Sequence, residues 1–182
     1  MSKRALIVVA DGIDDLHSVT LIDVLRRADI DVVVASIEAR RMLTAARGTR
    51  LTADTMLVDV LAQTFDLIVL PGGIPGAQHL AEHQPLAQRV REQAAAGLFY
   101  AGIGESPVLA LQAYGVLKQR RMTCSEAVSD HLSGCSFVSQ PVVVDGNCIT
   151  AQGSAAALEF ALMLVEQLCG KSRRSAVFKL ME

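Results

Sequence analysis

The stretch Phe65-Asp66-Leu67-Ile68-Val69-Leu70-Pro71-Gly72-Gly73 is a short apolar run that ends in a strong turn signal. A continuous, β-rich run of this length is typical of a strand that is covered on both faces in a parallel sheet. Proline cannot donate a backbone hydrogen bond, and two glycines permit an abrupt change of direction. The sequence therefore predicts a buried strand with a loop at its carboxyl end.

Buried-strand texture and helical periodicity alternate along the chain. Strands of the same type are predicted at three other ranges, 5–10, 31–37 and 98–103. Helices are predicted at about 84–96, at 154–168, and after Asp14-Asp15, where the apolar stripe comprises Leu16, Val19, Ile22 and Leu25. Strands that alternate with helices of this length predict a mainly parallel sheet between layers of helices, so the fold class is α/β.

The remaining segments predict local structure. The mixed texture of 42–52 is typical of a hairpin or an excursion from the sheet, and a hairpin is expected around Asp145-Gly146, a dipeptide that suits a tight turn. The basic tail, 171–182, is interpreted as a solvated end. Because the chain contains no repeat, low-complexity tract or linker, residues 1–182 are expected to form one domain.

Composition and charge narrow the classes of function. The net charge is −2 and the sequence pI is about 6.1, so nothing in the charge balance attracts nucleic acid or an anionic membrane. The apolar runs are short for a membrane span, and the first of them lacks the features of a signal peptide. We therefore expect a cytoplasmic protein without a nucleic-acid partner or membrane contact.

The cysteines and histidines do not form a recognisable metal motif. The chain has four cysteines, Cys124, Cys135, Cys148 and Cys169. They show neither CxxC spacing nor a histidine at zinc-ligand distance, so free thiols in a reducing compartment are expected. His79, His83 and His131 are interpreted as surface residues. The sequence predicts neither a metal site nor a cofactor.

In parallel α/β sheets, ligands bind beyond the carboxyl ends of the strands. Three turns fit that description, at 11–15, 71–76 and 104–107. The last, Gly104-Glu105-Ser106-Pro107, is not the G-x-S-x-G motif of hydrolases, because proline follows the serine. It instead predicts the start of a helix with Pro107 in the first turn.

Several motifs, taken in order, resemble the ThiJ/PfpI superfamily over essentially the whole chain. They are Lys3-Arg4-Ala5-Leu6-Ile7-Val8, Asp23-Val24-Leu25-Arg26-Arg27-Ala28, Asp66 to Gly73 with Gly76-Ala77-Gln78, Thr150-Ala151-Gln152-Gly153 and Leu158-Glu159-Phe160-Ala161. Their joint order carries the resemblance. It implies a homodimer and a flavodoxin-like three-layer α/β/α sandwich of the type also seen in class I glutamine amidotransferases.

The resemblance also implies an active site at the third turn. In that family a nucleophilic cysteine sits just before the elbow helix, whose N-terminus favours a thiolate. A glutamate from the first helix hydrogen-bonds the cysteine, a histidine often lies nearby, and backbone N–H groups bind the oxyanion. Here those N–H groups fall on Gly72, Gly73 and Glu105. Members have been assigned deglycase or glyoxalase activity, chaperone activity and oxidative-stress sensing.

All three side chains of that site are replaced in this sequence. By position, the cysteine falls on Gly104, the glutamate on His17 and the histidine on Cys124. Glycine has no side chain to attack a carbonyl, so the family's thiol chemistry cannot run from this position. Glycine also relieves strain at a positive φ, which suits a non-catalytic descendant.

Two replacements for the thiol remain open. If His17 and Cys124 border one pocket, the imidazole could activate the thiol; otherwise Cys124 is structural and His17 faces solvent. Glu105 could act as a general acid or base, although a carboxylate in the first turn of a helix commonly only complements the helix dipole.

Two classes of function follow. The first is a stress-related, dimeric binding or interaction protein, whose pocket takes a small carbonyl compound or an anion without turnover; Gly104 favours it. The second is an enzyme that acts on small reactive carbonyls and uses His17, Glu105 or Cys124 in place of the lost thiol. The polar residues expected at one pocket favour the second.

Overall fold

The computed structural model describes residues 2–182 and contains a seven-stranded sheet in the order β10-β11-β7-β6-β1-β2-β5. The strands are β1 (Arg4–Val9), β2 (Asp31–Ser36), β5 (Thr55–Met56), β6 (Leu67–Leu70), β7 (Phe99–Ile103), β10 (Val142–Asp145) and β11 (Cys148–Ala151). Every neighbouring pair is parallel except β10 and β11, which form the predicted antiparallel hairpin. The predicted mainly parallel α/β sheet is confirmed.

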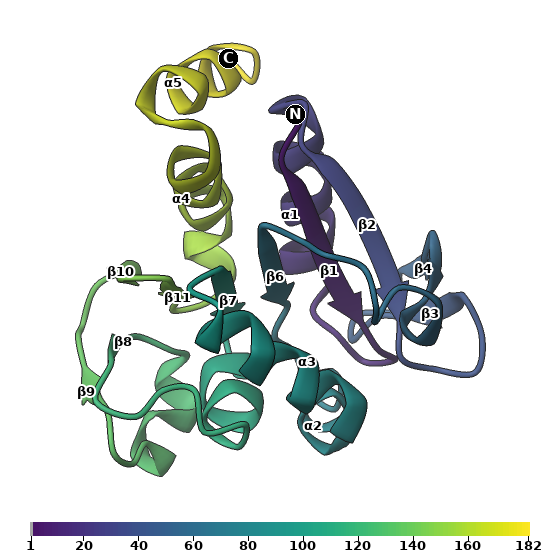
Figure 1. The fold of residues 1–182 in the computed structure, drawn as a ribbon, viewed down its shortest axis with the longest axis vertical. Helices are drawn as coiled ribbons and strands as arrows, with labels where there is room; N and C mark the ends of the chain where they lie inside the picture. The colour runs from purple at the N-terminus through teal and green to yellow at the C-terminus, as the bar shows by residue number, and fades with distance from the viewer. Residues whose placement is uncertain (1) are drawn as a thin grey trace.

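Helices cover both faces of this sheet. The α-helices are α1 (Asp15–Arg27), α2 (Gly76–Glu82), α3 (Gln84–Ala95), α4 (Ala157–Cys169) and α5 (Lys171–Lys179). The shorter helices are η1 (Leu57–Asp59), the π-helix η2 (Pro107–Gln112), η3 (Glu126–His131) and η4 (Ser154–Ala156). Helices α1 and α4 pack together on one face, and α2 and α3 lie on the other (Figure 1). The arrangement is the flavodoxin-like three-layer sandwich.

Two small sheets lie outside the central one. Strands β3 (Met42–Thr44) and β4 (Arg50–Thr52) form the hairpin predicted for 42–52. Strands β8 (Arg121–Met122) and β9 (Ser136–Phe137) form a second, parallel pair that the sequence did not indicate.

The central strands owe their position to continuous apolar sequence. Every residue of β6, and every residue of β1 after Arg4, is buried, so both faces of these strands are covered. A strand with alternating polar residues would place some of them in the core, at a cost in unpaired polar groups. These buried strands run from the end of the molecule where α5 lies toward the opposite end (Figure 1).

The predicted apolar stripe of α1 is right in its second half, where Leu25 is buried and Ile22 is half-buried, and wrong in its first half. Leu16 and Val19 are 49% and 50% exposed, and the helix instead buries a stripe that begins with His17 and Ser18 and continues through Leu21. Two polar residues therefore occupy the first buried turn, and the hydrophobic pattern alone could not locate that face. This rotation of the helix points His17 into the protein.

The basic tail is mostly exposed, as predicted, but it is more ordered than a solvated end. Residues 171–179 form helix α5, whose Val177 is buried. Arg173 donates to the carbonyl of Ala28 and pairs with Asp29, and Arg174 donates to Glu166 at 2.7 Å. These contacts hold α5 against α4 and the end of α1. No helix within residues 2–182 is long and apolar enough to cross a membrane.

Candidate functional site

The elbow after β7 is centred on Gly104, which has a φ of +70°, in the left-handed region that favours glycine. Its N–H donates to the carbonyl of Ala151 at 3.1 Å, and its own carbonyl accepts from the Ser125 N–H at 2.8 Å. The following helix begins at Pro107, as predicted, after Ser106, whose hydroxyl donates to the carbonyl of Pro71. The elbow is therefore bonded to three neighbouring segments.

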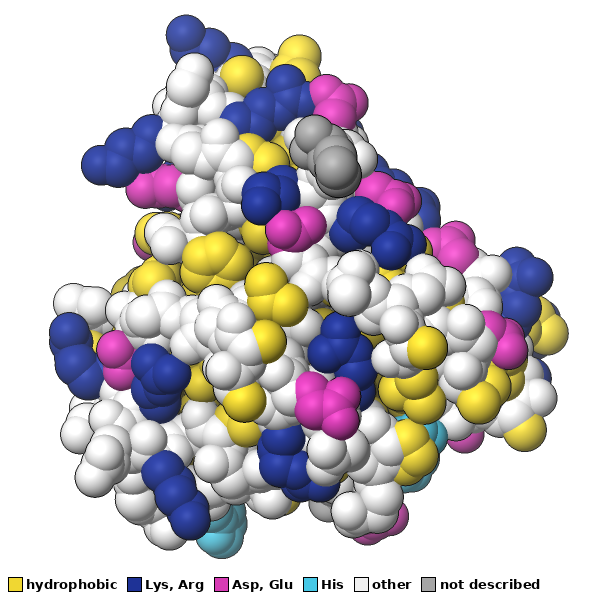
Figure 2. Space-filling view, in the orientation of Figure 1, with side chains coloured by type: hydrophobic (Ala, Val, Ile, Leu, Met, Phe, Trp, Pro, Cys, Tyr) yellow, Lys and Arg dark blue, Asp and Glu magenta, His cyan; other side chains and the backbone are white. Residues whose placement is uncertain are grey.

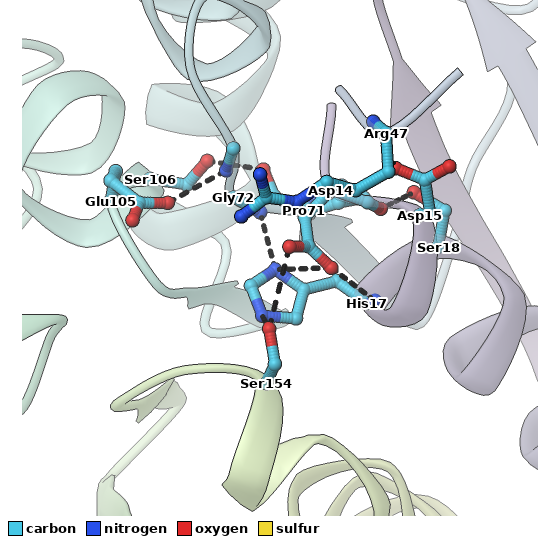
Figure 3. A network of polar contacts seen from close by, with 11 residues as sticks. Asp14, Asp15, His17, Ser18, Arg47, Pro71, Gly72, Glu105, Ser106 and Ser154 are labelled. Carbon is cyan, nitrogen blue, oxygen red and sulfur yellow. Dashed lines mark hydrogen bonds and ion pairs between the residues drawn. The ribbon is translucent and has the colours of Figure 1, made fainter. Parts of the chain in front are cut away.

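His17 lies beside this elbow and is 2% exposed, so the prediction that it faces solvent is wrong. It belongs to the first turn of α1, where the N-cap residue Asp14 accepts its backbone N–H at 2.9 Å. Its Nδ1 accepts the N–H of Gly72 at 3.2 Å, and its Nε2 lies 3.2 Å from Oγ of Ser154 (Figure 3). The Ser154 hydroxyl also lies 3.3 Å from Oδ2 of Asp14.

These contacts determine the tautomer of His17. Because Nδ1 accepts from a backbone N–H, the proton of the neutral ring sits on Nε2, which donates to Ser154. Ser154 in turn donates to Asp14. Asp14, His17 and Ser154 thus resemble a catalytic triad in composition, but the lone pair of the imidazole, on Nδ1, already accepts the N–H of Gly72. The ring cannot accept the serine proton in this arrangement.

The imidazole also sets the space available at the elbow. A β-carbon on Gly104 would lie 2.9 Å from Cε1 of His17, which is closer than carbon atoms normally pack. Burial lowers the pKa of His17, and the carboxylates of Asp14 and Glu105 only partly oppose that shift. The ring is therefore neutral near pH 7.

Glu105 turns its carboxylate back onto the Pro-Gly-Gly loop. Its Oε2 accepts the N–H of Gly73 at 2.7 Å, and a β-carbon on Gly72 would lie 2.7 Å from the same oxygen. Two of the backbone donors predicted for an oxyanion are consequently occupied: Gly72 donates to His17, and Gly73 donates to Glu105. The protein's own side chains stand where a bound anion was expected.

A cavity of about 400 Å³ opens onto these groups. Its lining residues are Asp14, His17, Ala46, Arg47, Gly73, Ile74, Glu105, Ser125, Gly153 and Ser154. The carboxylate of Asp15 positions Arg47 by accepting the backbone N–H groups of Arg47 and Thr49, at 2.8 and 3.0 Å. Sequence reasoning missed Arg47 and Ser154 as site residues, because neither belongs to a motif that marks a pocket.

Cys124 is buried and lines a different cavity, of about 580 Å³, which adjoins the first through Ser125, Gly153 and Ser154. His17 and Cys124 therefore line two adjoining cavities. Burial raises the pKa of the Cys124 thiol to about 11. Within the described chain, no hydrogen bond joins this thiol to the imidazole, and the environment favours the protonated form.

The other histidines lie away from this site. His131 is exposed as predicted, whereas His79 and His83 are half-buried. His79 lies 3.7 Å from Glu38, and the Nδ1 of His83 accepts the N–H of Leu86 at the start of α3. Residues 2–182 contain no group of three or more His, Cys, Asp or Glu side chains that could hold a metal ion.

The chain is similar to known proteins in both sequence and structure. The family model described as DJ-1/PfpI matches residues 3–167. Protein DJ-1 homolog B of Arabidopsis thaliana is 39% identical over 173 residues, which cover 94% of this chain but 40% of that relative. The glutathione-independent glyoxalase DJR-1.2 of Caenorhabditis elegans is 32% identical over 97% of this chain and 95% of its own length. The crystal structure of Drosophila melanogaster DJ-1beta superimposes with a TM-score of 0.96 at 34% identity, covering 100% of this chain and 98% of that one.

Proposed function

The chain belongs to the DJ-1/PfpI family, and on that premise we propose that it is a stress-related member whose pocket binds a small molecule without the family's thiol chemistry. The observation that carries this proposal is Gly104. It stands at the elbow where the family's nucleophilic cysteine is expected, and Cε1 of His17 fills the space that the cysteine side chain would need. A binding or interaction role without turnover follows.

The rest of the pocket supports the same conclusion. No cysteine is among the described residues that line the cavity with His17 and Glu105. Because burial raises its pKa to about 11, the thiol of Cys124 is predominantly protonated near pH 7. A thiol that is protonated and lines the adjoining cavity, away from the elbow, is a poor replacement for an elbow thiolate.

The second candidate is an enzyme that acts on small reactive carbonyls. The glyoxalase name of the Caenorhabditis elegans relative favours it, as does the carboxylate of Glu105, which lines the cavity and is placed to act as a general acid or base. Against an enzyme, Glu105 already accepts the N–H of Gly73, which is one of the donors that would stabilise an oxyanion.

We also propose that two copies of the chain form a homodimer. Several large apolar side chains are exposed on helices α1 and α4, which pack together, and on the C-terminal segment: Leu16, Val19, Leu158, Phe178, Leu180 and Met181. Figure 2 shows hydrophobic side chains beside basic ones at the end of the molecule where α5 lies. Exposed apolar surface of this kind commonly marks a protein interface.

The test is turnover of methylglyoxal by the purified chain, a Gly104→Cys variant and a Gly104→Cys/His17→Glu variant. The parent is expected to be inert, and the double variant to gain turnover, because it removes the imidazole from the space of the new thiol and supplies the expected carboxylate. Turnover by the parent would contradict the proposal. Its loss in Cys124→Ala would then identify a relocated thiol, and its loss in Glu105→Gln would identify a carboxylate enzyme.

A further inference from the structure

Two opposite charges line the same cavity without pairing with each other. Arg47 and Glu105 both face the cavity of about 400 Å³. In the described part of the chain, the guanidinium of Arg47 forms no hydrogen bond or ion pair, and Oε1 of Glu105 accepts no hydrogen bond. The donors of the Arg47 guanidinium and Oε1 of Glu105 are therefore available to a ligand that enters the cavity.

A ligand with a single charge fits this pair poorly. An anion near Arg47 would also meet Glu105 and Asp14, and could reach the Gly73 N–H only by displacing the Glu105 carboxylate. A simple cation near Glu105 would meet the guanidinium of Arg47. A small molecule that carries both charges satisfies both side chains, because complementary charges select their partner and like charges reject others.

The remaining polar groups agree with an ammonium on the carboxylate side. The two oxygens of Asp14 accept one hydrogen bond each, from the His17 N–H and the Ser154 hydroxyl, so each keeps a free lone pair. Asp14 and Glu105 line the same cavity, so their free lone pairs are acceptors available to an ammonium group that enters it. Arg47 offers a fork of donors that suits a carboxylate.

The neighbouring cavity provides room for a side chain. It adjoins the first through Ser125, Gly153 and Ser154, and its other lining residues include Phe137 and the carboxylates of Glu126 and Glu159. No lysine or arginine is among its described lining residues. An aliphatic chain that packs on Phe137 and ends in a positive charge complements this lining.

We propose that the two cavities together bind a zwitterionic α-amino acid, and that a basic side chain is preferred. The ammonium group lies between Glu105 and Asp14, the carboxylate binds Arg47, and the side chain extends into the cavity lined by Phe137. This assignment rests on the proposed binding role and specifies its ligand.

The test is isothermal titration calorimetry on the full chain at low salt, with three probes that share a three-carbon skeleton: L-alanine, L-alaninamide and propionate. L-Alanine is expected to bind, and the other two to bind about tenfold more weakly or less, because each lacks one charge-assisted contact. L-Lysine is expected to bind more tightly than L-alanine, and L-glutamate more weakly. Equal affinity for propionate or for L-alaninamide would overturn the assignment, as would an absence of binding by every probe.

Matched variants separate the site from general charge effects. Arg47→Gln and Glu105→Gln are each expected to weaken L-alanine binding about tenfold. Arg50→Gln and Glu82→Gln remove exposed charges outside both cavities, so they are expected to leave binding unchanged. Urea midpoints confirm that each variant is folded. Absence of binding by an inert parent overturns this inference alone, whereas methylglyoxal turnover by the parent overturns the proposed function.

Discussion

The imidazole of His17 occupies the space next to Gly104 that a side chain at position 104 would enter, with 2.9 Å between Cε1 and the site of a β-carbon. The Gly72 N–H holds the ring in that place through Nδ1. The two positions are therefore linked: a histidine at 17 fits because residue 104 is a glycine, and a cysteine at 104 would require the ring to move.

Gly104→Ala is expected to destabilise the protein by about 2 kcal/mol, from two additive causes. A left-handed φ costs a non-glycine residue about 1 kcal/mol, and the contact with His17 adds a similar amount. Gly97→Ala is the matched control, because Gly97 has a φ of +73° with open space around its β-carbon position. Urea denaturation measures both. The two variants could instead lose the same stability, and the loss in Gly104→Ala could stay the same when His17 is also replaced by Ala. That result would show that the contact between residue 104 and His17 does not affect stability.

The free energy of unfolding is expected to fall as the pH drops below about 6.5, in part because of His17. Burial lowers the pKa of His17 below its ordinary value of 6.5. The nearby carboxylates of Asp14 and Glu105 raise that pKa, but by less than burial lowers it. Between the folded and unfolded pKa values the unfolded chain binds the extra proton, so this stability is complete above pH 6.5 and is lost as the pH falls through the folded pKa. The slope for one group is at most about 1.4 kcal/mol per pH unit.

Burial also lowers the pKa of His83, so the contribution of His17 has to be isolated by difference. The parent and a His17→Gln variant are compared by urea denaturation from about pH 5 to about pH 8. Their stability difference is expected to shrink as the pH falls. A difference that stays constant across this range would mean that His17 does not resist protonation.

Much of the fold followed from local patterns in the sequence. The apolar runs that became β1, β6 and β7 are continuous because the strands are covered on both faces, so their position in the sheet was encoded locally. The turn at Asp145-Gly146 and the helix start at Pro107 were encoded in the same way. The buried face of α1 was not encoded in this way, because the residues that it buries in its first turn are polar.

The site was only partly accessible to sequence reasoning. Its location at the carboxyl ends of the strands, and the place of Gly104 at the elbow after β7, follow from position in the chain. The return of the Glu105 carboxylate onto Gly73, across 32 positions, and the meeting of Ser154 with His17, across 137, depend on tertiary packing. No spacing rule connects such residues, so their bonds could not be predicted before the fold was known.

Cys124 is expected to react slowly with iodoacetamide at neutral pH. Burial raises the pKa of its thiol to about 11 and shields it, whereas Cys169 is exposed. Peptide mass spectrometry over a time course is expected to show Cys169 modified at least about tenfold faster than Cys124. Cys148, buried and with a pKa also raised to about 11, serves as the internal comparison. Modification of Cys124 ahead of Cys169 would indicate an activated thiolate and revive the relocated nucleophile.

Leu16→Asp is expected to convert a homodimer into monomers. Leu16 is 49% exposed and lies on α1 near a second exposed apolar residue, Val19, so a carboxylate there would be buried without a partner in the proposed interface. Light scattering coupled to gel filtration measures the mass, and the dissociation constant is expected to rise more than about tenfold. Val58→Asp is the control, because Val58 is 73% exposed in η1, outside α1, α4 and α5. A parent that is monomeric at the loading concentration would contradict the homodimer. A Leu16→Asp variant that keeps the mass of a dimer would show that the interface does not include Leu16.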